Sequence, residues 1–208
     1  NQKIIEEAPA PGVTPELRAA MGAAAESLAR AVGYVNAGTV EFLLTPDGAF
    51  HFLEMNTRIQ VEHPVTEEVT GLNLIRLQFD VAMGKPLSFD LDSVALEGHA
   101  IEARLCAEDP DDGFKPQRGP LTLETFSGEW PAMRLDAGIT PVISGDYDSM
   151  IAKIIVKGAT REEARAKLDA ALADLLPLGI RTNRRFLRSV LNDPVFIEAA
   201  MDTGWLNR

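Results

Sequence analysis

Three oxygen-bearing side chains stand on two short apolar segments that a turn joins. Glu41 lies within the run 39–44, and Glu54 and Asn56 end the run that follows it. Carboxylate and amide oxygens are the ligands that Mg²⁺ prefers, and Mg²⁺ often shares them with water and substrate phosphates. If these three side chains meet at one point, they form a site for a divalent cation.

The two segments predict a β-hairpin that would bring them together. Residues 39–44 and 49–54 are expected to form strands, and Pro46-Asp47-Gly48 is a turn signal. A two-residue loop at 47–48, or a four-residue loop at 46–49, sets Glu41 opposite Glu54, with Asn56 on the same face. Opposed carboxylates lie about 5 Å apart and repel each other, and among apolar neighbours an unpaired charge is costly. A cation would remove both costs; the alternative is an exposed sheet face that simply carries acids.

The alternation of side chains continues beyond the hairpin. One face of an extended segment is expected to carry Glu54, Asn56, Arg58, Gln60 and Glu62, and His63-Pro64 would end the strand. The planar guanidinium of Arg58 can hold a carboxylate or a phosphate. Glu62 lies beyond it and can act as a base. The alternative is a plain ion pair between Arg58 and Glu62.

Helices and further strands flank this segment. A helix is predicted over 14–33, with Thr14 as its cap and Pro15 in its first turn, and another over 65–84, interrupted at Gly71. A second unit begins between Lys85-Pro86 and about Val94. It is expected to hold a half-buried strand over 99–105, short strands over 120–126, 131–137 and 150–157, and helices from Thr160 to about Leu175 and from Thr182 to Leu191. The fold class is therefore α+β.

Composition excludes several classes of protein. The formal net charge is −11 and no basic cluster is evident, so a nucleic-acid partner is not expected. No apolar run is long enough to span a bilayer, so a membrane partner is not expected either. The single cysteine, Cys106, stands in an apolar run, which favours a buried thiol and a reducing compartment. The first residues do not form a signal peptide, and the absence of an initial Met suggests a piece of a longer chain.

Residues 54–66, EMNTRIQVEHPVT, resemble the signature of the biotin-dependent carboxylases within the ATP-grasp fold. Three further blocks also resemble that family: residues 2–9, 98–104 and 147–153. The resemblance implies the C-terminal half of an ATP-grasp domain over 1–90. A biotin carboxylase C-terminal domain, mostly antiparallel sheet with helices, would follow over 91–208, and the full-length parent would be a homodimer.

The resemblance also implies a two-stage reaction. ATP and bicarbonate would give carboxyphosphate, which then carboxylates N1′ of biotin on a carrier protein. The implied cofactors are Mg²⁺ (or Mn²⁺) and ATP, with biotin as a carrier-bound substrate. The implied partners are a biotin carboxyl carrier domain and a carboxyltransferase. The expected location is the cytoplasm of a bacterium, or the mitochondrial matrix of a eukaryote.

Individual roles follow from the matched motifs. Glu41, Glu54 and Asn56 would bind the metal, Arg58 would bind and orient bicarbonate, and Glu62 would deprotonate it. Other contacts would come from Gln60 and Val61 to bicarbonate, from Lys3 to bicarbonate or the transferring phosphate, and from Leu43 and Leu53 to adenine, although a plain core role fits both leucines as well. Arg134 resembles the arginine that steadies the biotin enolate. The spacing from Arg134 to the 147–149 block is about two residues shorter than the family pattern, so a surface arginine is its alternative.

Some family features are missing from these 208 residues. No glycine-rich phosphate loop and no Met-Lys-Met biotin acceptor occur, so the chain alone is expected to turn over ATP negligibly. Asn1 replaces the histidine of one version of the motif and resembles the propionyl- or acyl-CoA carboxylase branch. Two other readings remain: another ATP-grasp ligase, such as a carbamoyl-phosphate synthetase, and a non-catalytic dimerisation or docking module.

Overall fold

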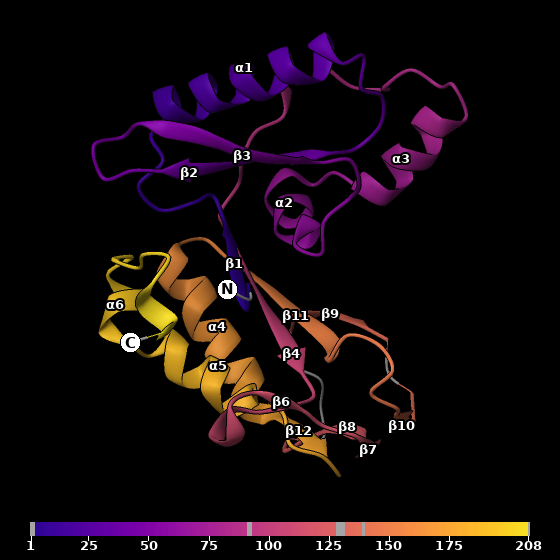
Figure 1. Ribbon diagram of the computed structural model, residues 1–208, viewed down its shortest axis with the longest axis vertical. Coiled ribbons are helices and arrows are strands. Elements are labelled where there is room, and N and C mark those ends of the chain that lie inside the picture. Colours follow the sequence, from indigo (N-terminus) through magenta and orange to yellow (C-terminus); the bar gives the residue numbers. More distant parts are fainter. Residues whose placement is uncertain (1–2, 91–92, 128–131, 139, 208) are drawn as a thin grey trace. The chain divides into compact units, whose positions relative to one another are not determined.

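The computed structural model describes residues 3–90, 93–127, 132–138 and 140–207, so Asn1 lies outside the described residues. The chain divides into two compact units (Figure 1), one of residues Pro9–Leu96 and the other of Asn1–Ala8 with Glu97–Arg208. Residues 1–8 belong to the second unit because strand β1 (Ile5–Ala8) pairs with β4 (His99–Cys106). The division into family domains at residue 90 stays a prediction.

The unit Pro9–Leu96 contains one hairpin and three helices. Its elements are α1 (Pro15–Ala31), β2 (Thr39–Leu44), β3 (Phe50–Asn56), α2 (His63–Thr70) and α3 (Leu74–Ala82). The predicted cap is confirmed, since Thr14 Oγ1 accepts a hydrogen bond from Leu17 N at 3.2 Å. The predicted break is confirmed too, because Gly71 ends α2 in the left-handed conformation, with φ 71°.

The other unit is built on a four-stranded antiparallel sheet in the order β1-β4-β11-β9. β4 and β11 (Met150–Gly158) are its central strands, and β1 and β9 (Arg134–Ala137) are its edges. Two-stranded ladders join β5 (Glu108–Asp109) to β6 (Lys115–Pro116), β7 (Gly119–Pro120) to β10 (Val142–Ile143), and β8 (Thr122–Thr125) to β12 (Leu175–Leu178). The helices are α4 (Arg161–Asp174), α5 (Arg184–Leu191) and α6 (Pro194–Ile197), with short 3₁₀ turns at Pro110–Asp112 and Trp205–Asn207.

The core of this unit lies between the sheet and helices α4 and α5. Ile101, Leu105 and Ile154 of the sheet and Leu168 and Leu172 of α4 are completely buried there. The prediction of a half-buried strand over 99–105 is wrong, because every residue of β4 except Arg104 is buried. The strand is flanked on both edges by β1 and β11, and its second face buries polar side chains that the alternation had assigned to solvent.

A buried ionic cluster fixes β1 to the rest of this unit. Glu7 on β1 accepts a hydrogen bond from His99 Nε2 at 2.7 Å. The guanidinium of Arg161 donates two more to the same carboxylate, at 2.7 and 3.1 Å. Arg161 also stacks over the ring of Phe196 at 4.8 Å. A strand of only four residues is therefore held by side chains from two other elements, β4 and α4.

The α+β fold class is confirmed, with both helices and antiparallel sheets present. The strand β12 was missed, and α4 ends at Asp174, one residue before the predicted limit. Asn183, rather than Thr182, is the residue before α5; its side chain holds the end of β4 by accepting from Cys106 N at 2.9 Å. Cys106 is buried as predicted, and burial raises the pKa of its thiol to about 12. Among the described helices, none has the length and apolarity to cross a membrane.

Candidate active site

The hairpin brings the predicted metal ligands onto one face. Glu41 lies directly opposite Glu54, and Thr39 lies opposite Asn56, as the sequence register predicted. The loop was predicted incorrectly, because Leu44 pairs with Phe50 and leaves five residues, 45–49, in the turn. A register shift after Glu41 leaves Leu53 as an extra residue in β3. The odd number of residues in the turn and the extra residue in β3 offset each other in the register. The prediction that Glu41 lies opposite Glu54 was therefore correct although the predicted loop was not.

Two amide side chains donate to the opposed carboxylates, and that of Asn56 bridges them. Asn56 Nδ2 donates to Glu41 Oε1 at 3.1 Å and to Glu54 Oε1 at 3.0 Å. Gln60 Nε2 donates to Glu41 Oε1 at 2.7 Å. These charge-assisted hydrogen bonds offset part of the repulsion between the two acids. The four side chains are therefore brought together, and the sequence had not anticipated that the amides serve as donors.

The chemistry of this cluster fits a hard divalent cation. Two carboxylates and an amide lie within hydrogen-bond reach of one another, and the amide of Asn56 presents its oxygen instead of its nitrogen if it turns about its last bond. In the part of the chain that the structure describes, no group of three His, Cys, Asp or Glu is placed to hold a metal. The third oxygen would have to come from Asn56, with substrate phosphates and water completing the shell.

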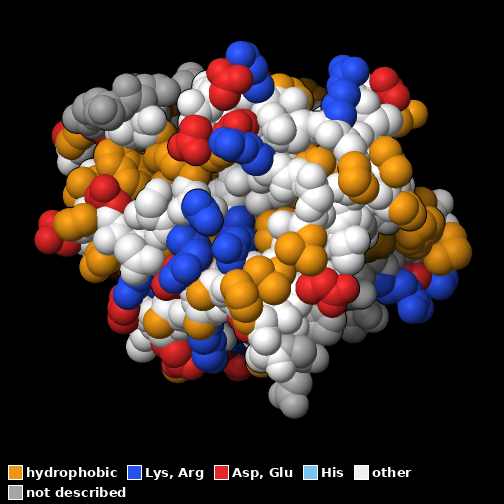
Figure 2. Space-filling model, turned by 90° about the horizontal axis from the view of Figure 1, so that it is seen from below, with side chains coloured by type: hydrophobic (Ala, Val, Ile, Leu, Met, Phe, Trp, Pro, Cys, Tyr) orange, Lys and Arg blue, Asp and Glu red, His pale blue; other side chains and the backbone are white. Residues whose placement is uncertain are grey.

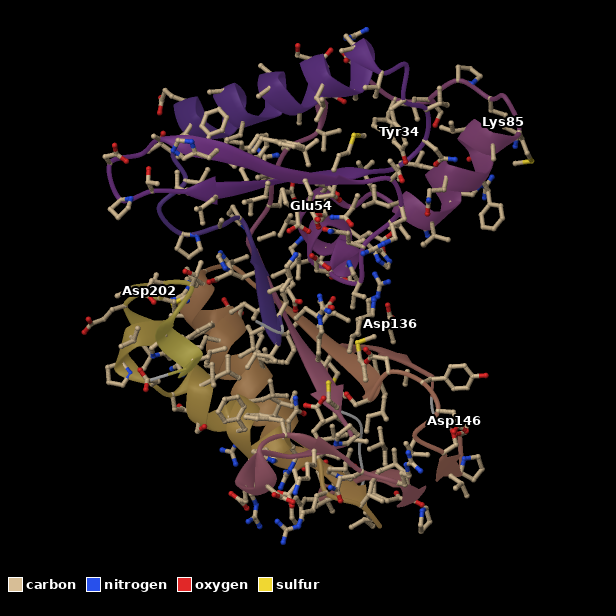
Figure 3. All side chains as sticks on the ribbon, viewed as in Figure 1. Tyr34, Glu54, Lys85, Asp136, Asp146 and Asp202 are labelled. Atoms are coloured by element: carbon tan, nitrogen blue, oxygen red, sulfur yellow. The ribbon has the colours of Figure 1, made fainter. Side chains whose placement is uncertain are left out.

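The surroundings of the cluster are more open than expected. Glu54 is exposed, so burial among apolar neighbours does not contribute to the cost of its charge. Leu43 and Leu53 are 41% and 56% exposed, which rules out a plain core role for either. Leu43 lies on the face of the hairpin that carries Glu41 and Glu54. Figure 3 labels Glu54, among other oxygen- and nitrogen-tipped side chains, on β3.

The segment after Asn56 is not an extended strand, which corrects the prediction. β3 ends at Asn56, residues 57–58 form a bend, and Val61 and Glu62 form a turn that leads into α2. Pro64 favours this outcome, because its fixed φ suits the first turn of a helix as well as it stops a strand.

Glu62 occupies the N-cap position of α2, and the guanidinium of Arg58 donates to the carbonyl of Ile59 at 3.3 Å. Among the described residues, no carboxylate lies within ion-pair distance of Arg58, so the plain Arg58–Glu62 ion pair is not formed.

The remaining predicted residues lie in the other compact unit. Lys3 is exposed and lies two residues before the start of β1, whereas Arg134 begins β9 and its side chain is 31% exposed. Arg134 Nε and Nη2 each donate to a different carboxylate oxygen of Asp136, both at 2.9 Å. Lys153 Nζ lies 3.4 Å from the same carboxylate. Asp136 is labelled in Figure 3, and its ion pair shows that Arg134 is not simply a solvated surface arginine.

Asp136 and Lys153 are residues that sequence reasoning missed. Asp136 is two positions after Arg134 on one strand, so both side chains point to the same face. Lys153 lies opposite Asp136 in the register of β11 with β9. The hydrogen bond from Arg134, followed by the charges of Arg134 and Lys153, holds the pKa of Asp136 below its usual value. The spacing of two residues between Arg134 and Asp136 could have predicted their ion pair from the sequence. The register of β11 against β9, which brings Lys153 to Asp136, could not be predicted in this way.

Two family profiles match the chain. The one described as "Carbamoyl-phosphate synthase L chain, ATP binding domain" matches residues 1–89, and "Biotin carboxylase C-terminal domain" matches residues 102–208, just over half of the chain. Biotin carboxylase 1, chloroplastic, from Populus trichocarpa is 45% identical over 99% of this chain and 39% of its own length. Biotin carboxylase 2 from Bacillus subtilis is also 45% identical, over 100% of this chain and 47% of its own. The chain thus spans less than half the length of these relatives.

A solved structure gives the same result. The biotin carboxylase domain of the 2-oxoglutarate carboxylase from Hydrogenobacter thermophilus, a dimer in complex with MgADP, ADP and bicarbonate, superposes with a TM-score of 0.93. It is 36% identical in sequence and covers 100% of this chain, which corresponds to 46% of that chain. The match over residues 102–208 distinguishes this chain from other ATP-grasp ligases. The chain belongs to the biotin carboxylase family.

Proposed function

We propose that these residues are part of an ATP-dependent ligase that carboxylates biotin on a carrier protein, using bicarbonate and Mg-ATP by way of carboxyphosphate. The observation that carries the proposal is the hairpin cluster, in which Glu41, Glu54 and Asn56 share one face and Gln60 reaches the same carboxylate. The Hydrogenobacter relative was solved with MgADP and bicarbonate, which supports the same classes of ligand here.

The hairpin unit would perform the first stage. Glu41, Glu54 and Asn56 would hold Mg²⁺ or Mn²⁺, which supplies positive charge to the phosphate oxygens of ATP when it is bound. Arg58 would bind and orient bicarbonate, since within the described ranges its guanidinium donates only to the carbonyl of Ile59.

Glu62 would take the bicarbonate proton, so that a bicarbonate oxygen bonds to the γ-phosphorus as the bond to ADP breaks. The remaining substrate contacts of this unit would come from Gln60 and Val61 to bicarbonate and from Leu43 and Leu53 to adenine.

The other unit would serve the second stage. N1′ of biotin would lose its proton to the phosphate released from carboxyphosphate, which places negative charge on the ureido oxygen, and N1′ would then take the carboxyl group. A fixed guanidinium stabilises such charge without reorganising. Arg134 would supply that guanidinium, and its two hydrogen bonds to Asp136 keep it in one orientation. Lys3 would bind bicarbonate or the transferring phosphate.

The partners and location are proposed on the same basis. The carrier domain would present biotin, a carboxyltransferase would accept the carboxyl group, and the longer protein would form a homodimer. The expected host compartment is the bacterial cytoplasm or the mitochondrial matrix. The name of the poplar relative places that protein in a chloroplast, so the compartment would follow the host.

Binding of a magnesium nucleotide tests the proposal. Calorimetry with MgADP should detect binding to the chain, and Glu54→Ala should abolish it because one of two opposed carboxylates is lost. Glu26→Ala is the matched control, since it removes the same charge from helix α1, where Glu26 forms an exposed pair with Arg30. Equal binding by the wild type and Glu54→Ala would contradict the proposed metal site and favour a docking module.

Turnover tests whether the 208 residues suffice. We expect negligible ATP hydrolysis, because no glycine-rich loop is present to cover the phosphates. Phosphate release would be measured with and without bicarbonate and free biotin. Robust hydrolysis that depends on both would show that this chain carries a complete active site.

A further inference from the structure

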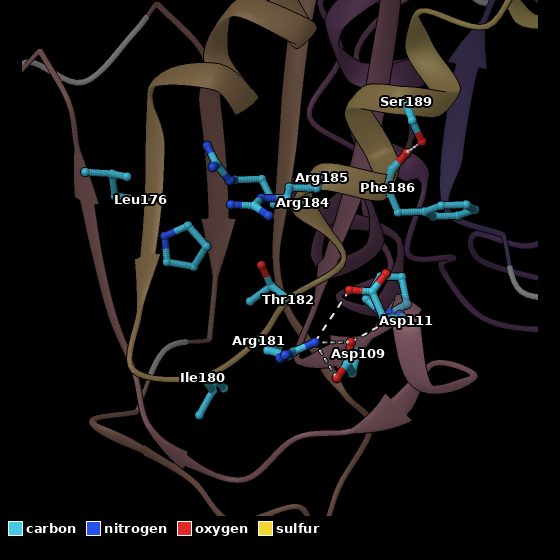
Figure 4. A pocket seen from close by; sticks show the side chains of 12 residues that line it. Asp109, Asp111, Leu176, Ile180, Arg181, Thr182, Arg184, Arg185, Phe186 and Ser189 are labelled. Atoms are coloured by element: carbon cyan, nitrogen blue, oxygen red, sulfur yellow. Dashed lines mark hydrogen bonds and ion pairs between the residues drawn. The ribbon is translucent and has the colours of Figure 1, made fainter.

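We call the unit of Asn1–Ala8 and Glu97–Arg208 the C-terminal unit. An open pocket of about 640 Å³ lies within it, between β12, the turn that follows β12 and the start of α5. Three arginines line it, namely Arg181, Arg184 and Arg185 (Figure 4). The expectation that the chain has no basic cluster is wrong here, because Arg184 and Arg185 at the beginning of α5 and Arg181 before it line one cavity. Figure 2, which views the molecule from the side of β12 and β8, shows Lys and Arg side chains gathered beside hydrophobic ones.

Two of the three arginines are held in place by the protein. Arg181 Nη1 lies 2.9 Å from a carboxylate oxygen of Asp109 and 3.5 Å from one of Asp111. Arg184 Nη1 donates to the carbonyls of Leu172, Ala173 and Leu175, at 2.9, 3.1 and 2.7 Å. These carbonyls end helix α4, so Arg184 caps that helix with part of its guanidinium. Its position does not depend on any ligand.

Arg185 differs from both neighbours. It is exposed, and no hydrogen bond or ion pair joins its side chain to another residue of the described ranges. Its guanidinium lies next to that of Arg184 in Figure 4. Burial, followed by the charges of Arg188 and Arg185, lowers the pKa of Arg184. Two cations thus stand side by side at the first turn of a helix, where the helix dipole also disfavours positive charge.

The rest of the pocket lining is mixed, with Asp109, Asp111, Thr182 and Ser189 beside an apolar part. Leu176 and Pro177 of β12 and Ile180 of the following turn contribute to it. We propose that the pocket binds a small organic oxyanion, with its phosphate or carboxylate head between Arg184 and Arg185 and an apolar body against Leu176 and Pro177. An oxyanion would remove the repulsion between the two guanidinium groups and accept bidentate hydrogen bonds from them. The site does not depend on the proposed ligase function.

Four probes separate the parts of this proposal in calorimetry on the purified chain: phenyl phosphate, benzoate, inorganic phosphate and benzyl alcohol. Phenyl phosphate and benzoate each carry an anionic group and an apolar ring. Inorganic phosphate has only the anionic group, and benzyl alcohol has the ring without a charge. We expect phenyl phosphate or benzoate to bind more tightly than inorganic phosphate, with no heat from benzyl alcohol. The better of the first two identifies the head group, and added salt should weaken its binding.

Arg185→Gln is the informative variant, because Arg185 is exposed and pairs with no residue that the structure describes, so its loss should leave the fold intact. We expect Arg185→Gln to lower the affinity for the tighter-binding probe about fivefold, which is the effect of one exposed charged contact. Arg185→Lys keeps the charge but not the planar guanidinium, so its affinity for the probe should lie between those of the wild type and Arg185→Gln. Arg18→Gln, at an exposed arginine of α1, is the charge-matched control and should bind like the wild type.

The proposal is overturned if neither phenyl phosphate nor benzoate binds, or if Arg185→Gln binds the better probe as tightly as the wild type. It is also overturned if inorganic phosphate binds as tightly as phenyl phosphate, because the apolar wall would then contribute nothing. Circular dichroism of Arg185→Gln confirms that a loss of binding reflects the missing guanidinium and not unfolding.

Discussion

The opposed glutamates should destabilise the hairpin when no cation is bound. Asn56 Nδ2 lies 3.1 Å from one carboxylate oxygen and 3.0 Å from the other, so these oxygens of Glu41 and Glu54 are at most 6.1 Å apart, the sum of the two distances. Two charges at about 6 Å repel by roughly 0.7 kcal/mol in water, and by more near a protein surface. Glu54→Gln removes this repulsion and keeps an oxygen that accepts from Asn56. We expect the hairpin to gain about 0.5–1 kcal/mol in EDTA.

Hydrogen exchange followed by mass spectrometry measures this locally. Peptides that cover β2 and β3 should exchange about two- to fivefold more slowly in Glu54→Gln than in the wild type, as the stated free energy requires. Peptides of the C-terminal unit should not change. Glu26→Gln makes the same change of charge but removes an exposed pair with Arg30, so it should leave exchange in the hairpin unaltered.

Magnesium should reverse the order of the two proteins. Added Mg²⁺ is expected to slow exchange in the wild-type hairpin and to have little effect in Glu54→Gln, which offers one carboxylate instead of two. Exchange in EDTA that is equal in both proteins, or faster in Glu54→Gln, would refute the claim that the opposed carboxylates repel each other across the hairpin.

Three other residues give further predictions. Glu7→Ala should destabilise the C-terminal unit by about 1.5–3 kcal/mol in chemical denaturation, because Arg161 and His99 lose the carboxylate that they share; a loss below 1 kcal/mol would contradict that role. The lowered pKa of Asp136 means that its contribution to stability is present above its unfolded pKa and is lost as the pH falls through the folded value. Asp136→Asn should therefore flatten the acid limb of a stability–pH curve, and an unchanged limb would be evidence against the ion pair with Arg134. Cys106, with a pKa near 12, should resist iodoacetamide at pH 8 and react fully in denaturant; rapid labelling of the native chain would show that the thiol is accessible.

Local signals predicted most of the secondary structure. Thr14 with Pro15 located the start of α1, and Gly71 located the break between α2 and α3. Long-range pairing was not readable: β1 and β12 find their partners in distant parts of the chain, and short strands carry little periodicity. The burial of β4 was misjudged for the same reason, since alternation cannot tell whether the polar face of a strand is covered.

The candidate site was likewise predicted from the sequence only in part. The register of Glu41 and Glu54 followed from the turn, although a five-residue loop and a bulge produced it together. The extended segment through Glu62 failed because Pro64 is compatible both with the end of a strand and with the start of a helix. The contact of Gln60 with Glu41 depends on the bend between them, which no local pattern specifies.

The topology of the chain implies an order of folding. β1 is synthesised before the unit Pro9–Leu96, yet its partner β4 follows that unit, and Ala8 ends up paired with Ala100. During synthesis β1 can pair with β4 only after β4 has emerged. If Pro9–Leu96 folds first with its two ends close, closing the long loop between the strands costs less entropy than joining the same residues unfolded. Folding of the unit Pro9–Leu96 would therefore favour the pairing of β1 with β4.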